Sequence, residues 1–203
     1  MVRNNGLSHY YSEEQKSPLN LRKVKDVLRN NSLEFYTGSG VFSLKKIDKG
    51  TKLLTENAIM QKDWKVLDIG CGYGVIGISI AKAFPETSIL MTDINRRAIK
   101  LAKMNLELNL IPNAEVRQSN LYENIEEKFN TILVNPPQTA GKDMCFEIIE
   151  KAKDHLEKHG LFQLVARHNK GGKQLSKKME EVYNNVKDIA KKGGYRVYVS
   201  EKK

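Results

Sequence analysis

The sequence lacks the cysteines, the long apolar runs and the leader segment that several classes of protein require. Only two cysteines occur among its 203 residues, so it offers neither a disulfide framework nor a four-cysteine zinc site. No window approaches the roughly 18 uninterrupted apolar residues of a membrane span, and the N-terminus has no apolar h-region. We therefore expect a cytoplasmic protein that does not enter the membrane.

Acidic residues are scarce toward the C-terminus. The formal net charge is +10, and residues 151–203 hold 14 Lys and Arg against 6 Asp and Glu, whereas residues 1–150 hold 20 against 18. A concentrated basic surface attracts nucleic-acid phosphates, although Lys-rich faces also keep proteins soluble, so charge alone leaves both interpretations open. If RNA binds, we expect Lys173, Lys177 and Lys178 to contribute.

The apolar pattern predicts an α/β fold. From residue 64 onward, short apolar strands alternate with amphipathic helical patterns, which indicates βαβ units and a mostly parallel sheet. Strands are expected at residues 65–69, 88–92, 114–118, 130–134, 161–166, 185–190 and 195–200. Helices are expected at residues 75–83, around 98–108, from 143 to about 160, and at 173–183. The turn Gly193-Gly194 suggests that the last two strands form an antiparallel hairpin.

The length suits one domain. We expect residues 1–63 to form an N-terminal cap within that domain, and residues 64–203 to form its α/β body. A helical stretch is predicted at residues 19–28, and β structure within residues 33–54. The cap is expected to pack on the catalytic face.

A glycine-rich turn follows the first expected strand of the body. Gly70, Gly72 and Gly74 let a ligand approach the backbone, and with Gly77 they also match the spacing of dinucleotide-binding turns. A nicotinamide cofactor is therefore one possibility. S-adenosylmethionine is favoured by Asp68, which lies two positions before the first glycine, and by an acidic residue at the end of the next strand.

That acidic residue is Asp93, which has enough acceptors to take both hydroxyls of a ribose. Its alternative role is to cap the following helix. Asn120 follows the third strand, where it could contact an adenine or form an Asx-turn. Their neighbours Ile94 and Leu121, together with Cys71 of the glycine turn, complete the expected cofactor contacts.

The segment Asn135-Pro136-Pro137 ends the fourth strand of the body. Two prolines have no use inside a buried strand, but they hold an Asn side chain and free carbonyls in one rigid arc. The Asn135 oxygen and the Pro136 carbonyl could accept both N–H groups of a planar amine, so that its lone pair faces a methyl donor. We expect catalysis by positioning and by complementing charge on nitrogen, without a strong base.

These motifs together resemble a Rossmann-like class I methyltransferase of the Asn-Pro-Pro group, which methylates exocyclic or amide nitrogens. The resemblance covers roughly residues 35–200 and is strongest to the catalytic domain of ribosomal small-subunit guanine-N2 methyltransferases. Its motifs are the glycine turn, Ser119-Asn120, Asn135-Pro136-Pro137, Gly40-Val41-Phe42-Ser43 and residues 47–54.

The resemblance implies further site residues. Thr51 would lie near the methionine carboxylate of the cofactor and Phe42 would line the site, although from the sequence alone they could be turn and core residues. Family members usually have an aromatic residue directly after the two prolines, where this sequence has Gln138. A ring could instead come from Phe42, Tyr10 or Tyr11, and Gln138, Lys142 and Arg167 are expected near the substrate.

The bacterial enzymes of this type carry a second, degenerate domain for RNA, for which 203 residues leave no room. We therefore expect recognition by the cap, by the basic C-terminal region or by a partner.

The leading hypothesis is an S-adenosylmethionine-dependent N-methyltransferase acting on guanine N2 in RNA, with ribosomal RNA ahead of transfer RNA. A protein glutamine N5-methyltransferase is the main alternative. A nicotinamide-dependent oxidoreductase and a non-catalytic RNA-binding module are less favoured. No metal is expected, because His155 and His159, spaced for one helix face, have no third ligand beside them.

Overall fold

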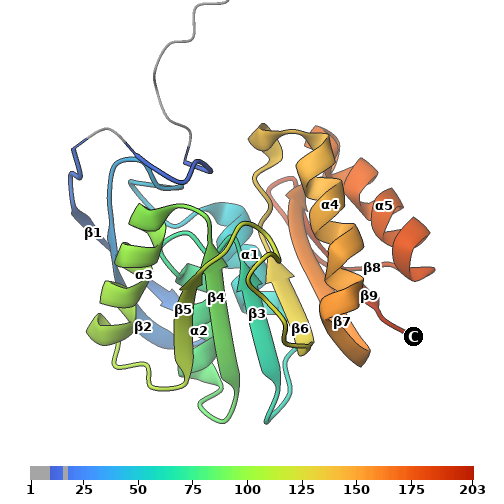
Figure 1. The fold of residues 1–203 in the computed structure, drawn as a ribbon, viewed down its shortest axis with the longest axis horizontal. Helices are drawn as coiled ribbons and strands as arrows, with labels where there is room; N and C mark the ends of the chain where they lie inside the picture. The colour runs from blue at the N-terminus through green and yellow to red at the C-terminus, as the bar shows by residue number, and fades with distance from the viewer. Residues whose placement is uncertain (1–9, 16–17) are drawn as a thin grey trace, which may run out of the picture.

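A computed structural model describes residues 10–15 and 18–203. Its seven-stranded sheet has the order β5-β4-β3-β6-β7-β9-β8, and a separate two-stranded sheet pairs β1 with β2 (Figure 1). The strands are β1 Arg22–Leu28, β2 Asn31–Thr37, β3 Lys65–Ile69, β4 Ser88–Asp93, β5 Ala114–Gln118, β6 Phe129–Val134, β7 Leu156–Arg167, β8 Lys187–Lys192 and β9 Tyr195–Glu201. The α-helices are α1 Lys49–Asn57, α2 Val75–Ala83, α3 Arg96–Leu108, α4 Lys142–Ala152 and α5 Lys173–Tyr183.

The expected architecture is confirmed. Strands β3 to β7 pair in parallel, and β9 runs antiparallel to both β7 and β8. Apolar side chains fill both faces of the sheet: in β3, Val66 packs with residues of α1, α2, α3 and the β1–β2 hairpin, whereas Leu67 packs with residues of α4 and α5. Strands buried on both faces explain the continuous apolar runs in the sequence.

The order in which the chain adds strands to the sheet reverses beside β3. Strand β4 lies on one side of it and β6 on the other, so the connections that follow these strands leave in opposite directions. In open α/β sheets, ligands bind at such a switch point, beyond the carboxyl ends of the strands. This places the ends of β3, β4 and β6 around one cleft.

Several local predictions were wrong. Residues 19–28 were expected to be helical, but their second part is β1, which alternates in exposure and turns tightly into β2 through Arg29 and Asn30, both with positive φ. Residues 33–54 contain not only β2 but also most of α1, which begins after the cap residue Asp48.

The expected helix from 143 to about 160 ends at Ala152, and β7 already begins at Leu156. His155 therefore stacks on Tyr122, while His159 lies in β7 beside Glu201, so the two histidines share no helix face. No group of three or more potential metal ligands occurs within the described residues.

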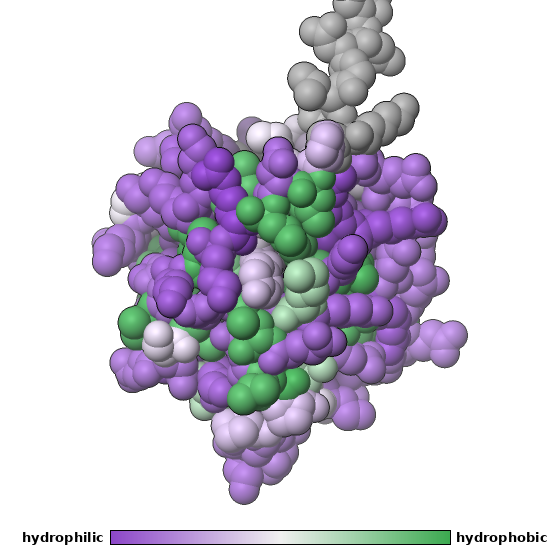
Figure 2. Space-filling view, turned by 90° about the vertical axis from the view of Figure 1, so that its left-hand side faces the viewer, coloured by the Kyte–Doolittle hydropathy of each residue, from purple (hydrophilic) through white to green (hydrophobic). Residues whose placement is uncertain are grey.

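Seen from the side of β1, β2 and α3, the surface is mainly hydrophilic, with hydrophobic residues gathered near its middle (Figure 2). None of the helices in the described part of the chain is long and apolar enough to cross a membrane.

Candidate active site

The glycine turn forms the floor of the cleft. Gly70 and Gly72 have φ values of +70° and +58°, and a Cβ at either position would meet no atom within 4 Å. The space above this backbone is therefore open to a ligand. Gly77 has a different role, because a Cβ there would lie 2.3 Å from the Met91 sulfur, so only glycine lets α2 pack this closely on β4.

Asp93 at the end of β4 holds the turn in place. Its Oδ2 accepts a hydrogen bond from the Gly72 N–H at 2.8 Å, and its Oδ1 accepts from the Asn95 N–H at 2.8 Å. Burial raises its pKa to about 6, although these backbone donors act in the opposite direction. Each carboxylate oxygen retains a second acceptor site, which suits a pair of vicinal hydroxyls.

Asp68 lies behind the turn rather than on the cleft wall. It is fully buried, and its Oδ2 accepts from the Gly77 N–H at 2.9 Å, whereas its Oδ1 has no hydrogen-bond partner within the described residues. Burial raises its pKa to about 7. Asp68 thus fixes the start of α2, and it does so at an electrostatic cost.

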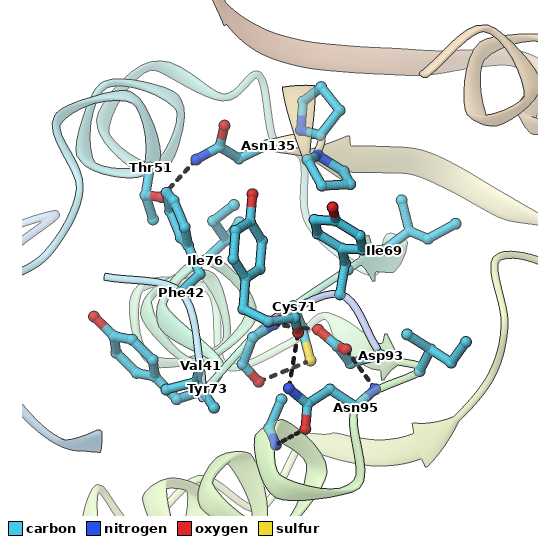
Figure 3. A pocket seen from close by; sticks show the side chains of 18 of the residues that line it. Val41, Phe42, Thr51, Ile69, Cys71, Tyr73, Ile76, Asp93, Asn95 and Asn135 are labelled. Atoms are coloured by element: carbon cyan, nitrogen blue, oxygen red, sulfur yellow. Dashed lines mark hydrogen bonds between the residues drawn. The ribbon is translucent and has the colours of Figure 1, made fainter. Parts of the chain in front are cut away.

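Asn135 at the end of β6 has a fixed amide orientation. Its Nδ2 donates to Thr51 Oγ1 at 2.9 Å and to Asp48 Oδ2 at 3.2 Å, so its oxygen points away from Thr51 (Figure 3). A carboxylate only accepts hydrogen bonds, which makes the reverse orientation of the amide unfavourable. Pro136 and Pro137 continue the cleft wall beside it.

Asp48 connects this amide to the rest of the fold. As the N-cap of α1, it accepts from the Thr51 N–H at 2.9 Å through Oδ2, while the Tyr195 hydroxyl donates to Oδ1 at 3.4 Å. The Tyr195 ring packs over Gly50, where a Cβ would approach within 2.8 Å. The sequence offered a signal for the cap, since Asp is a favoured N-cap residue before an apolar helical pattern. It offered none for Tyr195.

Three aromatic residues meet at the mouth of the cleft. The ring centroids of Tyr10 and Tyr11 are 5.2 Å apart, and those of Tyr10 and Phe42 are 5.4 Å apart. The Tyr10 hydroxyl hydrogen-bonds Thr139 Oγ1 at 3.0 Å, while the Tyr10 carbonyl accepts from Asn95 Nδ2 at 2.8 Å. The N-terminal segment is therefore fastened to both sides of the cleft.

Most of the site residues expected from the sequence lie around this one cleft. Its lining includes Phe42, Thr51, Gly70, Cys71, Gly72, Asp93, Ile94, Asn120, Leu121, Asn135, Pro136 and Pro137. Gly74, the N-cap of α2, lies behind the wall like Asp68. Asn120 is exposed at the rim and donates to Glu123 at 2.7 Å. Burial raises the pKa of the Cys71 thiol, which leaves it without nucleophilic character.

The expected substrate residues outside the wall are Lys142 and Arg167. The Lys142 ammonium lies 4.8 Å from the centroid of the Phe146 ring, and the Arg167 guanidinium lies 4.9 Å from that of the Tyr195 ring. Arg167 thus reaches the amide indirectly, through Tyr195 and Asp48. The side chain of Gln138 lies outside the described part of the structure.

The site residues are consistent with S-adenosylmethionine. The open glycine cradle leaves room for a ligand beside the backbone, and the carboxylate oxygens of Asp93 would be the acceptors for its ribose hydroxyls. The cleft combines these polar groups with apolar side chains such as Ile69 and Ile76, as binding sites for small molecules commonly do.

Comparisons with known proteins agree with this geometry. The family model described as "Methyltransferase small domain" matches residues 32–199. An uncharacterized protein, YbxB of Bacillus subtilis, is 38% identical over 197 residues, which are 96% of this chain and 98% of that protein. The ribosomal RNA small subunit methyltransferase C of Haemophilus influenzae is 34% identical over 200 residues, or 95% of this chain, which spans only 59% of that enzyme.

Solved structures show the same fold. A T. thermophilus 16S rRNA N2 G1207 methyltransferase in complex with AdoMet and guanosine matches with a TM-score of 0.78 and 23% identity, over 94% of this chain and 53% of that one. A ribosomal protein L11 methylase from Lactobacillus delbrueckii matches with a TM-score of 0.61 and 22% identity, over 76% of this chain and 78% of that one. The family match, with the cleft described above, replaces the nicotinamide interpretation of the glycine turn. The chain belongs to the methyltransferase small domain family and is an S-adenosylmethionine-dependent methyltransferase related to ribosomal RNA small subunit methyltransferase C.

Proposed function

We propose that the protein methylates the exocyclic N2 amine of guanine in RNA, with ribosomal RNA as the first candidate and transfer RNA as the second. The observation that carries this proposal is the orientation of the Asn135 amide. Its nitrogen is held by Thr51 and Asp48, so its oxygen is available to accept an N–H of the substrate amine. The Pro136 carbonyl is the proposed acceptor for the second N–H.

Two acceptors fix the plane of the amine, so that the nitrogen lone pair, which is perpendicular to this plane, can face the methyl donor. When bound, S-adenosylmethionine supplies an electrophilic methyl group. Positive charge that develops on the amine nitrogen faces the Asn135 oxygen, and the Asp48 carboxylate behind the amide polarises it further through the intervening N–H. The methylated amine then releases its proton to water, so the arrangement needs no strong base.

A base substrate is favoured over an amide by the aromatic residues at the mouth. Tyr10, Tyr11 and Phe42 offer ring faces, and enzymes that modify a base read it by stacking as well as by hydrogen bonds to its edge. The glutamine side chain of a protein substrate has no ring to stack. The basic C-terminal region and the named relatives also favour RNA.

The experiment is transfer of tritiated methyl groups from S-adenosylmethionine to small ribosomal subunits, naked ribosomal RNA, transfer RNA and total protein, each taken from cells that lack this protein. The proposal expects label in RNA and N2-methylguanosine after nuclease digestion and mass spectrometry. The Asn135→Ala variant provides the blank. Label in protein alone would instead support the glutamine N5-methyltransferase alternative.

A cytoplasmic location stays a prediction.

A further inference from the structure

A second pocket lies at the tip of the β8–β9 hairpin, on the same edge of the sheet as the amine site. Tyr195, the first residue of β9, pairs with Arg167, the last residue of β7. The parallel neighbour of β7 is β6, which ends beside Asn135. The hairpin tip and the catalytic amide are therefore neighbours at the carboxyl edge of the parallel strands.

Basic side chains surround this pocket. Its lining includes Lys191, Lys192 and Arg196 together with Gly193 and Gly194 of the turn. His168 also lines it, but burial and the nearby Arg196 and Lys173 lower the pKa of this imidazole. The backbone N–H of His168 donates to the Gly194 carbonyl at 2.9 Å, which fastens the segment after β7 to the hairpin tip. The two glycines add no side chains, so a ligand can approach the backbone of the turn.

Two of the three lysines on α5 have acidic partners, whereas the two lysines at the hairpin tip have none among the described residues. Lys177 and Lys178 form ion pairs with Glu181 and Glu150. By contrast, no ion pair involves Lys191 or Lys192 in the part of the chain that the structure describes, and Arg196 alone pairs with an acid of the hairpin, Asp188, at 2.6 Å.

The hairpin pocket is also connected to the amine site through hydrogen bonds. Tyr195 lines it, and the hydroxyl of this residue donates to Asp48, which accepts from the Asn135 amide. The exposed guanidinium of Arg167 lies over the ring of Tyr195. Only Tyr195 would lie between an anion bound in this pocket and Asp48, which orients the Asn135 amide.

From this placement we propose that the hairpin pocket binds a backbone phosphate of the substrate RNA, adjacent to the nucleotide whose base enters the cleft. This inference rests on the proposed function, because it assigns a position to the same RNA. An acidic protein segment is the competing occupant. RNA is favoured because its phosphates lie at a fixed, short spacing from every base, which suits a basic pocket beside a base-binding cleft.

The test compares Lys191→Ala/Lys192→Ala with a control of equal charge change, Lys100→Ala/Lys103→Ala on the exposed face of α3. Both are assayed with one small-subunit ribosomal RNA transcript, for binding across a salt series and for methyl transfer. We expect the hairpin variant to raise the KM for RNA roughly tenfold and to lower the salt slope of binding by about 1 to 2, with kcat within about twofold of the parent. The control should match the parent protein.

The outcomes separate this inference from the proposed function. If the parent methylates the transcript and the hairpin variant keeps its KM and salt slope, the pocket does not bind RNA, while the function stands. If the parent binds the transcript but labels only protein, the function fails. Polyglutamate that competes with RNA at equal charge concentration, and loses this ability in the hairpin variant alone, would assign the pocket to an acidic protein segment.

Discussion

Replacing Asp48 with alanine tests the amide orientation on which the proposed reaction depends. Asp48 Oδ2 accepts from the Asn135 amide at 3.2 Å and from the Thr51 N–H at 2.9 Å. In the parent protein the carboxylate excludes the flipped amide, since carboxylate and amide oxygens would then face each other. Thr51 alone cannot exclude it, because a hydroxyl can either accept from the amide nitrogen or donate to the amide oxygen.

The magnitude follows from these contacts. A hydrogen bond to a charged acceptor contributes about 1.5–3 kcal/mol, which corresponds to roughly a 10- to 150-fold preference for the productive orientation. Without Asp48 the two orientations become comparable in population, so kcat should fall only about two- to tenfold. Loss of the α1 cap should also lower the free energy of unfolding by about 1 kcal/mol, or the melting temperature by about 2–4 °C.

The assay measures kcat at saturating RNA and cofactor, the melting temperature, and the Kd of S-adenosylhomocysteine. Asp48→Asn serves as the matched control, because Asn is an equally good N-cap and should preserve the melting temperature while weakening the preference for one amide orientation. A loss of kcat in Asp48→Ala as large as that in Asn135→Ala would refute the reasoning, since Asp48 would then act directly on the substrate. An unchanged kcat would show that other groups orient the amide.

Three further predictions concern neighbouring groups. Asn135→Ala should reduce kcat by about 10²–10³ through loss of the amine acceptor, while the Kd of S-adenosylhomocysteine in calorimetry changes less than about threefold. The pKa of Asp93 in the free protein is raised to about 6, and ligand hydroxyls that donate to its carboxylate favour the ionised form. The affinity for S-adenosylhomocysteine should therefore be highest above pH 7 and fall as the pH drops below 6. An Asp93→Asn variant should lack this pH dependence. Burial raises the pKa of Asp68 to about 7, so between about pH 4 and 7 the folded state binds more protons than the unfolded state and loses stability as the pH rises. The Asp68→Asn variant should therefore have a melting temperature at least about 2 °C above that of the parent at pH 8. This difference should shrink toward pH 5.

The parts of the site that the sequence predicted are those that follow directly from strand ends. Gly70, Gly72, Asp93 and Asn135 each lie at or just after the carboxyl end of a central strand, and a doubly wound sheet brings such ends together at its switch point. The apolar runs located these strands, because strands buried on both faces are continuously hydrophobic. The motifs and the fold were therefore available from local patterns.

The supporting contacts were not available, because they join segments that are far apart in the chain. Asp48 meets Asn135 across 87 positions and Tyr195 across 147, and Tyr10 meets Thr139 across 129. The pattern of apolar residues within one segment does not indicate which distant residue its side chains will contact. The misplaced end of the helix before β7 has a similar origin. The residues after Ala152 have an apolar spacing that fits either state, and pairing with β6 decides in favour of the strand.

The aromatic cluster shows how the site can accommodate Gln138 after the two prolines. A ring at that position would belong to the same rigid arc as the amine acceptors. Here the rings come from the N-terminal segment and from Phe42, and Tyr10 is fastened to Thr139 on the amine side and to Asn95 on the cofactor side. The backbone N–H of Asn95 also donates to Asp93, the proposed ribose acceptor. The proposed cofactor and base sites therefore share Asn95. The proposed stacking surface for the base is thus connected to the turn at which we expect the methyl donor to bind.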